Sequence, residues 1–155
     1  MGLHEIQLHE IEILQGTIGE MNYPNDAGHD LYAELKEPVT LYPEPFKRTA
    51  TISTGLAIQM PKGMFAMVVT RSSMSQETDE KPSILCHNGI IDGDFNGKIK
   101  VVLSLIGKRP YTINPGDRIA QIIFLPKLAV AFVTGRKQTQ SSCKRGERGF
   151  GSTGK

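Results

Sequence analysis

The chain has 155 residues, a formal net charge of +2 and a hydrophobic fraction of 39%, so it can bury one sizeable core without disulfide or metal cross-links. No apolar run approaches the roughly 18 residues of a membrane-spanning helix. Residues 1–14 alternate charged with apolar residues where a signal peptide would be continuously apolar. Cys86 and Cys143 have no C-x-x-C spacing and indicate neither a disulfide framework nor a zinc site. We expect a single-domain intracellular protein without a membrane partner, in the cytoplasm or, for a viral source, in the host cytoplasm.

Short-period alternation of apolar and polar residues runs along most of the chain and is typical of half-buried strands. Turn-forming pairs such as Asp92-Gly93 and Asn96-Gly97 separate the apolar runs at the spacing of an all-β sandwich or barrel. One helical segment is expected at 72–81, where a serine can cap a short acidic turn before Pro82 ends it. The alternation predicts strands at 6–8, 11–13, 39–41, 52–58, 65–69, 99–105, 119–124 and 130–133.

The C-terminal stretch 134–155 is polar and rich in glycine, so we expect a flexible arm after a β domain at 1–133. Residues 136–155 carry six basic residues against Glu147 alone, a local charge of +5 that suits a small polyanion such as a polyphosphate. Phe150 is the single aromatic residue of the arm and offers no stacking platform for bases. Nucleic acid is therefore not expected as a partner.

Two metal- or phosphate-binding patterns are incomplete. His4, Glu5 and His9 approach the H-E-x-x-H zinc motif, but the histidines are five residues apart instead of four and would lie on opposite faces of a strand. The segment 149–155 approaches the G-x-x-x-x-G-K-[ST] phosphate loop, yet no Ser or Thr follows Lys155 to hold magnesium. Neither pattern predicts a site by itself.

Five separated segments nevertheless carry groups suited to phosphate chemistry. The first, 27–31, has Asp30 behind a glycine and by itself predicts a surface turn. The second, 71–73, joins Arg71 to two serine hydroxyls and favours an anion site.

The remaining three segments follow in the second half of the chain. Asp92 follows two apolar residues in a hairpin bracketed by glycines. An aspartate in such surroundings could act as a general base. Arg118 and Gln121 then interrupt an apolar strand. The last segment, 145–154, is the cationic, glycine-rich part of the arm.

Together and in this order, the segments resemble the five motifs of the trimeric deoxyuridine triphosphate diphosphatases (dUTPases). The resemblance covers nearly the whole chain and implies a distorted jelly-roll β-barrel subunit that assembles as a homotrimer. The matching motifs are A-G-x-D-L at 27–31, R-S-S at 71–73, I-D-x-x-(Y/F)-x-G at 91–97, G-D-R-I-A-Q at 116–121 and R-G-x-x-x-F-G-S-T-G at 145–154.

The resemblance implies that Asp92 activates a water for attack on the α-phosphorus of dUTP, giving dUMP and pyrophosphate. Such a reaction limits uracil incorporation into DNA and supplies dUMP for thymidylate synthesis. The hairpin backbone, with Asn88, Ile90 and Ile91, would bind the uracil edge and reject the amino group of cytosine. Phe95, where the family usually has Tyr, would lie under the deoxyribose and exclude a 2′-hydroxyl.

The resemblance also implies the phosphate contacts. Mg²⁺ would bridge the triphosphate, with Asp30 nearby through water. The arm would close last and would come from a neighbouring subunit, so that the active sites are shared. The implied contacts in the barrel are Arg71, Ser72, Ser73, Lys100 and Gln121, and those in the arm are Arg145 at the γ-phosphate, Phe150 over uracil, and Gly151, Ser152 and Thr153 at the phosphates.

Two departures and two alternative functions stay open. Cys86 stands where the family commonly has an Asn that contacts substrate, and residues 75–83 form a longer and more acidic loop than usual. A deoxycytidine triphosphate deaminase shares the implied fold, although the arm and the G-D-R-I-A-Q segment favour the diphosphatase. A trimeric nucleotide-sensing protein could use loop 74–83 to bind a regulatory partner, although a pure binder would not need Asp92 as a base.

Overall fold

The structure is a computed structural model that describes residues 8–21 and 23–135. These ranges form eleven strands and one short 3-10 turn, with no α-helix among them. No helix of the described residues is long and apolar enough to cross a membrane. The elements are β1 (Glu12–Gln15), β2 (Gly28–Tyr32), β3 (Val39–Leu41), β4 (Thr49–Ser53), β5 (Ala57–Gln59), β6 (Met64–Val69), η1 (Ser72–Met74), β7 (Ile84–Cys86), β8 (Gly89–Ile91), β9 (Lys100–Leu105), β10 (Tyr111–Ile113) and β11 (Arg118–Pro126).

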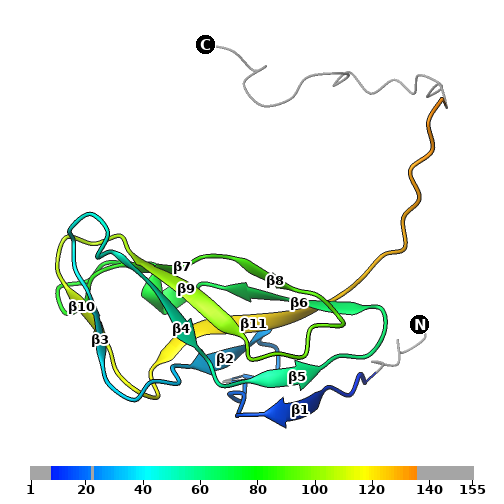
Figure 1. Ribbon diagram of the computed structural model, residues 1–155, viewed down its shortest axis with the longest axis horizontal. Helices are drawn as coiled ribbons and strands as arrows, with labels where there is room; N and C mark the ends of the chain where they lie inside the picture. The colour runs from blue at the N-terminus through cyan, green and yellow to red at the C-terminus, as the bar shows by residue number, and fades with distance from the viewer. Residues whose placement is uncertain (1–7, 22, 136–155) are drawn as a thin grey trace.

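The strands form two main antiparallel sheets and two smaller strand pairs (Figure 1). The larger sheet has the order β2-β11-β6-β8, and the smaller one has the order β4-β9-β7. The pairs β1-β5 and β3-β10 complete the described strands. Apolar side chains of both main sheets share one core, including Leu31, Val68 and Ile122 from the larger and Ile52, Ile84 and Leu103 from the smaller. The expected all-β fold is confirmed.

Period-two alternation decides which side chains enter this core. In β9, Val101, Leu103 and Leu105 are buried, whereas Lys100 is exposed at the start of the strand. In β11, Ile122 is fully buried, while its neighbours on the opposite face are only half-buried. This outer face of the larger sheet therefore has room for polar and reactive side chains.

Two of the expected elements are wrong in part. The expected strand 52–58 is two strands, because Gly55 between them adopts φ +69° and turns the chain. The expected helix 72–81 is only the three-residue turn η1, and Thr78 and Lys81 close a separate turn through a backbone hydrogen bond of 2.9 Å. The expected strand 6–8 lies mostly outside the described residues.

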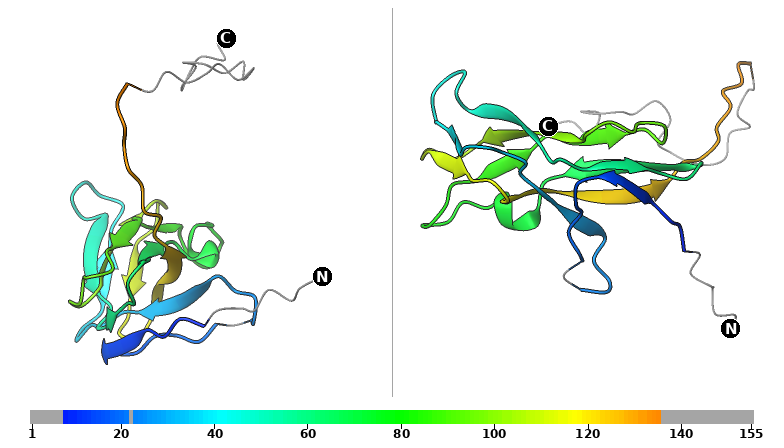
Figure 2. Two further views of the ribbon diagram at one scale, coloured as in Figure 1. Left: turned by 90° about the vertical axis from the view of Figure 1, so that its right-hand side faces the viewer. Right: turned by 60° about the horizontal axis from the view of Figure 1, so that its bottom comes forward.

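The expected strand at 130–133 is absent from the structure. The N–H of Lys127 donates to the carbonyl of Gly63 at 2.8 Å, and beyond that bond the chain extends away from the sheets (Figure 1, Figure 2). The apolar side chains of this extension are exposed. They are Leu128, Val130, Phe132 and Val133. The last strand of the described residues ends at Pro126, and residues 136–155 of the expected arm 134–155 lie outside the described residues, so the domain boundary stays a prediction.

Candidate active site

Asp30 lies in β2 on the outer face of the larger sheet and is buried to 8% residual exposure. Nε of Arg71 donates to its Oδ1 at 2.6 Å, and Nη2 of Arg71 lies 3.4 Å from Oδ2. Nη1 of Arg118 donates to the same Oδ2 at 3.4 Å. Two arginines thus share one carboxylate, and the cluster as a whole favours an anion. The expectation that 27–31 forms a surface turn is wrong, since residues 28–31 belong to β2 of the larger sheet.

Sheet register explains how three distant motifs meet in this cluster. Gln121 of β11 lies opposite Asp30 of β2 on one side and opposite Val69 of β6 on the other. Two residues after Val69, the chain reaches Arg71. A Cβ at Gly28 would lie 2.8 Å from Oε1 of Gln121, so a larger residue there would displace the end of the Gln121 side chain. The structure therefore brings Asp30, Arg71 and Gln121 together.

The two serines of the second motif lie beside this cluster. Ser72 and Ser73 begin η1 and are both exposed. Arg71 precedes them in extended conformation, with φ −72° and ψ 138°. Their hydroxyls are accessible to a ligand that also contacts the Arg71 guanidinium.

Asp92 lies at the other end of the larger sheet. It directly follows β8, is exposed, and its carbonyl accepts a hydrogen bond from the N–H of Phe95 at 3.0 Å. A Cβ at Gly93 would come within 2.6 Å of the Met64 carbonyl oxygen, so glycine is required for this close approach. The Phe95 ring packs against Gly97 and keeps 42% of its surface exposed.

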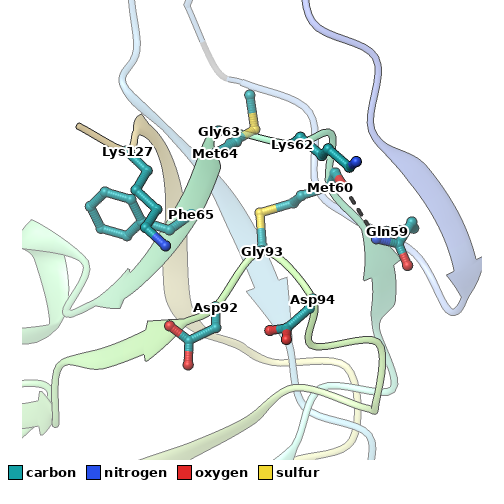
Figure 3. Close-up of a pocket in the computed structure, with 10 residues that line it drawn as sticks. All are labelled: Gln59, Met60, Lys62, Gly63, Met64, Phe65, Asp92, Gly93, Asp94 and Lys127. Carbon is teal, nitrogen blue, oxygen red and sulfur yellow. Dashed lines mark hydrogen bonds between the residues drawn. The ribbon is translucent and has the colours of Figure 1, made fainter. Parts of the chain in front are cut away.

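Asp92 and Asp94 border a pocket of about 760 Å³ beneath the turn that leads into β6. Figure 3 shows their carboxylates on the hairpin, with Lys127 reaching in from the end of β11. Met60, Met64 and Phe65 are among the residues that line it. The candidate base is thus accessible from a pocket of mixed charge.

The candidate base is far from the arginine cluster within one chain. The β6-β8 ladder places Ile91 opposite Ala66, so Asp92 falls next to Phe65. Arg71 lies six residues further along β6 and its extension. At about 3.3 Å per residue, the separation is about 20 Å. A single chain therefore does not bring Asp92 to Arg71.

The other expected hairpin residues have different surroundings. Ile90 is exposed on the outer sheet face, opposite Met67, whereas Ile91 packs against the core. Asn88 is exposed just before β8, and Lys100 is exposed at the start of β9 in the smaller sheet. The expected residues Arg145, Phe150, Gly151, Ser152 and Thr153 lie outside the described residues.

Cys86 does not present its side chain to a ligand. It is buried in the core, its thiol donates to the His87 carbonyl at 3.5 Å, and burial raises its pKa to about 11. The residue is therefore an inert, reduced thiol at neutral pH.

Two residues that bond members of the arginine cluster were given no role by the sequence analysis. Arg118 was visible as a charge within a strand, whereas Thr70, which accepts a bond from Gln121, gave no signal.

Comparison with known proteins identifies the family. The dUTPase family model matches residues 15–154. The chain belongs to the dUTPase family. The deoxyuridine 5′-triphosphate nucleotidohydrolase of Coxiella burnetii (strain RSA 493 / Nine Mile phase I) is 39% identical to this chain over 160 residues, which cover 97% of each. That of Ehrlichia canis (strain Jake) is 38% identical over 130 residues, covering 84% of this chain and 82% of the relative.

Solved structures support the same dUTPase fold. The native EIAV dUTPase superposes with a TM-score of 0.67 at 27% identity, covering 84% of this chain and 100% of that chain. The dUTPase of Staphylococcus bacteriophage 80alpha with dUpNHpp superposes with a TM-score of 0.69 at 24% identity, covering 95% of this chain and 98% of that chain. At that identity, the phage enzyme supports the fold alone.

Proposed function

We propose that this chain hydrolyses dUTP to dUMP and pyrophosphate, with Asp92 as the base that activates the attacking water. The observation that carries the proposal is the family match over residues 15–154, because that range includes Asp30, Arg71, Asp92 and Gln121. An exposed carboxylate on a tight glycine turn can accept a proton from water as that water attacks the α-phosphorus. The oxygen that bridges the α- and β-phosphates then leaves with pyrophosphate.

The hairpin after β7 would select the base and the sugar. Backbone groups at 88–92 would bind the uracil edge, with Asn88 before the strand and Ile90 and Ile91 within it. Cytosine would be rejected because its amino group would face a donor. Phe95, half-exposed beside Gly97, would close the space that a 2′-hydroxyl needs, and Lys100 would contact the substrate from β9.

The arginine cluster would bind the phosphates. Arg71, Ser72, Ser73 and Gln121 are the proposed contacts, and charge-assisted hydrogen bonds from the guanidinium would be the strongest of them. The remaining proposed contacts are in the arm and are inferred from the sequence motif alone. They are Arg145 at the γ-phosphate, Phe150 over the uracil, and Gly151, Ser152 and Thr153 at the phosphates.

Magnesium fits this site as an ion carried by the triphosphate. Within the described part of the chain, no group of three or more Asp, Glu, His or Cys side chains could hold a metal ion. The carboxylate of Asp30 already accepts bonds from Arg71 and Arg118. Mg²⁺ commonly keeps several waters and uses one or two carboxylates plus substrate phosphates. Asp30 would therefore reach the ion through water, and the bound ion would neutralise phosphate charge.

The active site is proposed to form between subunits of a homotrimer. A triphosphate cannot span the separation of about 20 Å between Asp92 and Arg71 of one chain, so the two must come from different chains. The outer face of the larger sheet supports association, because a face this apolar is typical of a contact surface. Its half-buried or exposed apolar residues are Phe65, Met67, Val69, Ile90, Ile123 and Leu125.

Pyrophosphate release with dUTP, dCTP, dTTP and UTP, each with Mg²⁺, tests the proposed activity. Hydrolysis of dUTP with little turnover of the other three is the expected result. Turnover of dCTP to a uridine nucleotide would instead favour the deaminase. Tight binding of dUTP without pyrophosphate release would favour the nucleotide-sensing protein.

A further inference from the structure

Thr70 joins three segments at the point where the chain enters the R-S-S turn. Its hydroxyl donates to the carbonyl of Cys86 at 2.9 Å and accepts from the N–H of Cys86 at 2.9 Å. Its own carbonyl accepts from Nε2 of Gln121 at 3.1 Å. One residue thus contacts the end of β7 and the side chain of β11 while it continues β6.

The hydroxyl bonds connect strands that no described ladder joins. β6 belongs to the larger sheet and β7 to the smaller one, and the described strand pairings do not include β6 with β7. In a strand pair, the backbone N–H and carbonyl of a facing residue would bond Cys86. Here the Thr70 hydroxyl makes both of these bonds instead. Both partners are backbone groups of a buried residue, Cys86, so the position of Thr70 is fixed from the core side.

The same anchor determines where two proposed phosphate contacts lie. The Thr70 carbonyl holds the Gln121 amide, and the next residue along the chain is Arg71, whose guanidinium is bound by Asp30. A shift of Thr70 would therefore move Gln121 and the start of the R-S-S turn together. It would leave Asp92 itself in place, since the β6-β8 pairing puts Asp92 next to Phe65, five residues before Thr70.

We propose that Thr70 is a positioning residue for the triphosphate, acting through its hydroxyl on Gln121 and on the Arg71-Ser72-Ser73 turn. The inference rests on the proposed function and names a residue outside the motifs as part of the phosphate-binding machinery. A merely structural threonine would affect thermal stability without a selective effect on nucleotide affinity.

The test compares Thr70→Val, which keeps the branched shape and removes the hydroxyl, with Thr70→Ser, which keeps the hydroxyl. The Kd of the non-hydrolysable analogue dUpNHpp is measured calorimetrically, together with KM and kcat for dUTP and with Tm. Thr70→Val should raise Kd and KM about tenfold, the scale of one positioned hydrogen bond, with a smaller change in kcat. Thr70→Ser should stay within about twofold of the parent.

Thr49→Val serves as the matched control, because its hydroxyl bonds Ser104 at 3.0 Å on the exposed face of the smaller sheet. It should leave Kd unchanged. If Thr70→Val does not fold, Thr70→Cys takes its place, since a thiol is a weaker hydrogen-bonding group.

The outcomes separate the two proposals. A folded Thr70→Val variant with the parent Kd and only a lower Tm would overturn the positioning role. Equal loss in Thr70→Val and Thr70→Ser would also overturn it. A parent that binds dUpNHpp but does not hydrolyse dUTP would overturn the proposed activity, while the Kd comparison would still decide the role of Thr70. A parent that does not bind dUpNHpp would overturn both.

Discussion

The guanidinium of Arg71 is bound edge-on by the carboxylate of Asp30, with Nε 2.6 Å from Oδ1. Their side chains are only 18% and 10% exposed, so solvent screens the pair weakly. Arg118 adds a longer contact of 3.4 Å from a half-exposed position. The orientation of Arg71 is therefore decided before any substrate arrives, and such preorganisation lowers the entropy cost of binding.

Asp30→Asn should destabilise the fold and weaken nucleotide binding. The variant leaves Arg71 without its counter-charge, a change that costs roughly 3–5 kcal/mol for a fully buried pair and somewhat less here, because the Arg71 side chain keeps 18% of its surface exposed. Urea denaturation measures the change. Glu34→Gln is the control, since the ion pair of Glu34 with Lys98 is exposed and its loss should hardly alter stability. Equal free energies of unfolding for both variants would show that the Asp30 cluster does not stabilise the fold.

Asp92→Asn should bind dUpNHpp with nearly the parent affinity and lose roughly 10²–10⁴ in kcat, because the amide keeps the shape and lacks the basicity. Single-turnover kinetics with dUTP measure the chemical step. Asp94→Asn is a matched control, since Asp94 borders the same pocket two residues away and should retain activity within a few-fold. A parent-like rate in Asp92→Asn would remove Asp92 as the base.

Phe95→Ala should raise UTP hydrolysis relative to dUTP, because the ring that blocks a 2′-hydroxyl is gone. Phe95→Tyr should be nearly neutral, since it keeps the ring. The ratio of kcat/KM for the two nucleotides is the measurement. If that ratio is the same in parent and alanine variant, the sugar is selected by another part of the site.

Mixed subunits test whether Asp92 and Arg71 act from different chains. Asp92→Asn chains and Arg71→Met chains should each be nearly inactive as pure assemblies. After mixing and refolding together, part of the activity should return, because some sites then receive Asp92 from one chain and Arg71 from another. Native mass spectrometry verifies that mixed trimers form. Mixed trimers that stay inactive would contradict the shared site.

Sequence patterning predicted the core strands well wherever one face is buried. In β9, alternate residues from Val101 to Leu105 point inward, as the alternation requires. The same rule failed at 130–133, where the apolar side chains are exposed. Alternation indicates that a segment can bury one face, but not whether its own chain supplies the covering surface. Gly55 likewise interrupts an apolar run with a turn that the run itself does not reveal.

The sequence predicted which residues belong to the candidate site, but not how they are arranged in space. Motif order implied that Asp30, Arg71 and Gln121 serve one ligand, and the β2-β11-β6 register brings them together. Nothing in the sequence indicated that Asp92 lies at the far end of the same sheet, because that depends on the antiparallel pairing of β8 with β6. Thr70 was also unpredictable, since its two bonds to Cys86 depend on a contact between sheets.

The proposed pairing of Asp92 from one chain with Arg71 from another would make catalysis depend on protein concentration. If each site needs two chains, a newly synthesised subunit hydrolyses nothing until it meets its copies. Specific activity should then fall on dilution below the assembly constant and recover on reconcentration. Near the assembly constant, a small change in expression level would change dUTP turnover by more than the change in the amount of protein. The arrangement of the larger sheet would then determine the lowest protein concentration at which dUTP is hydrolysed.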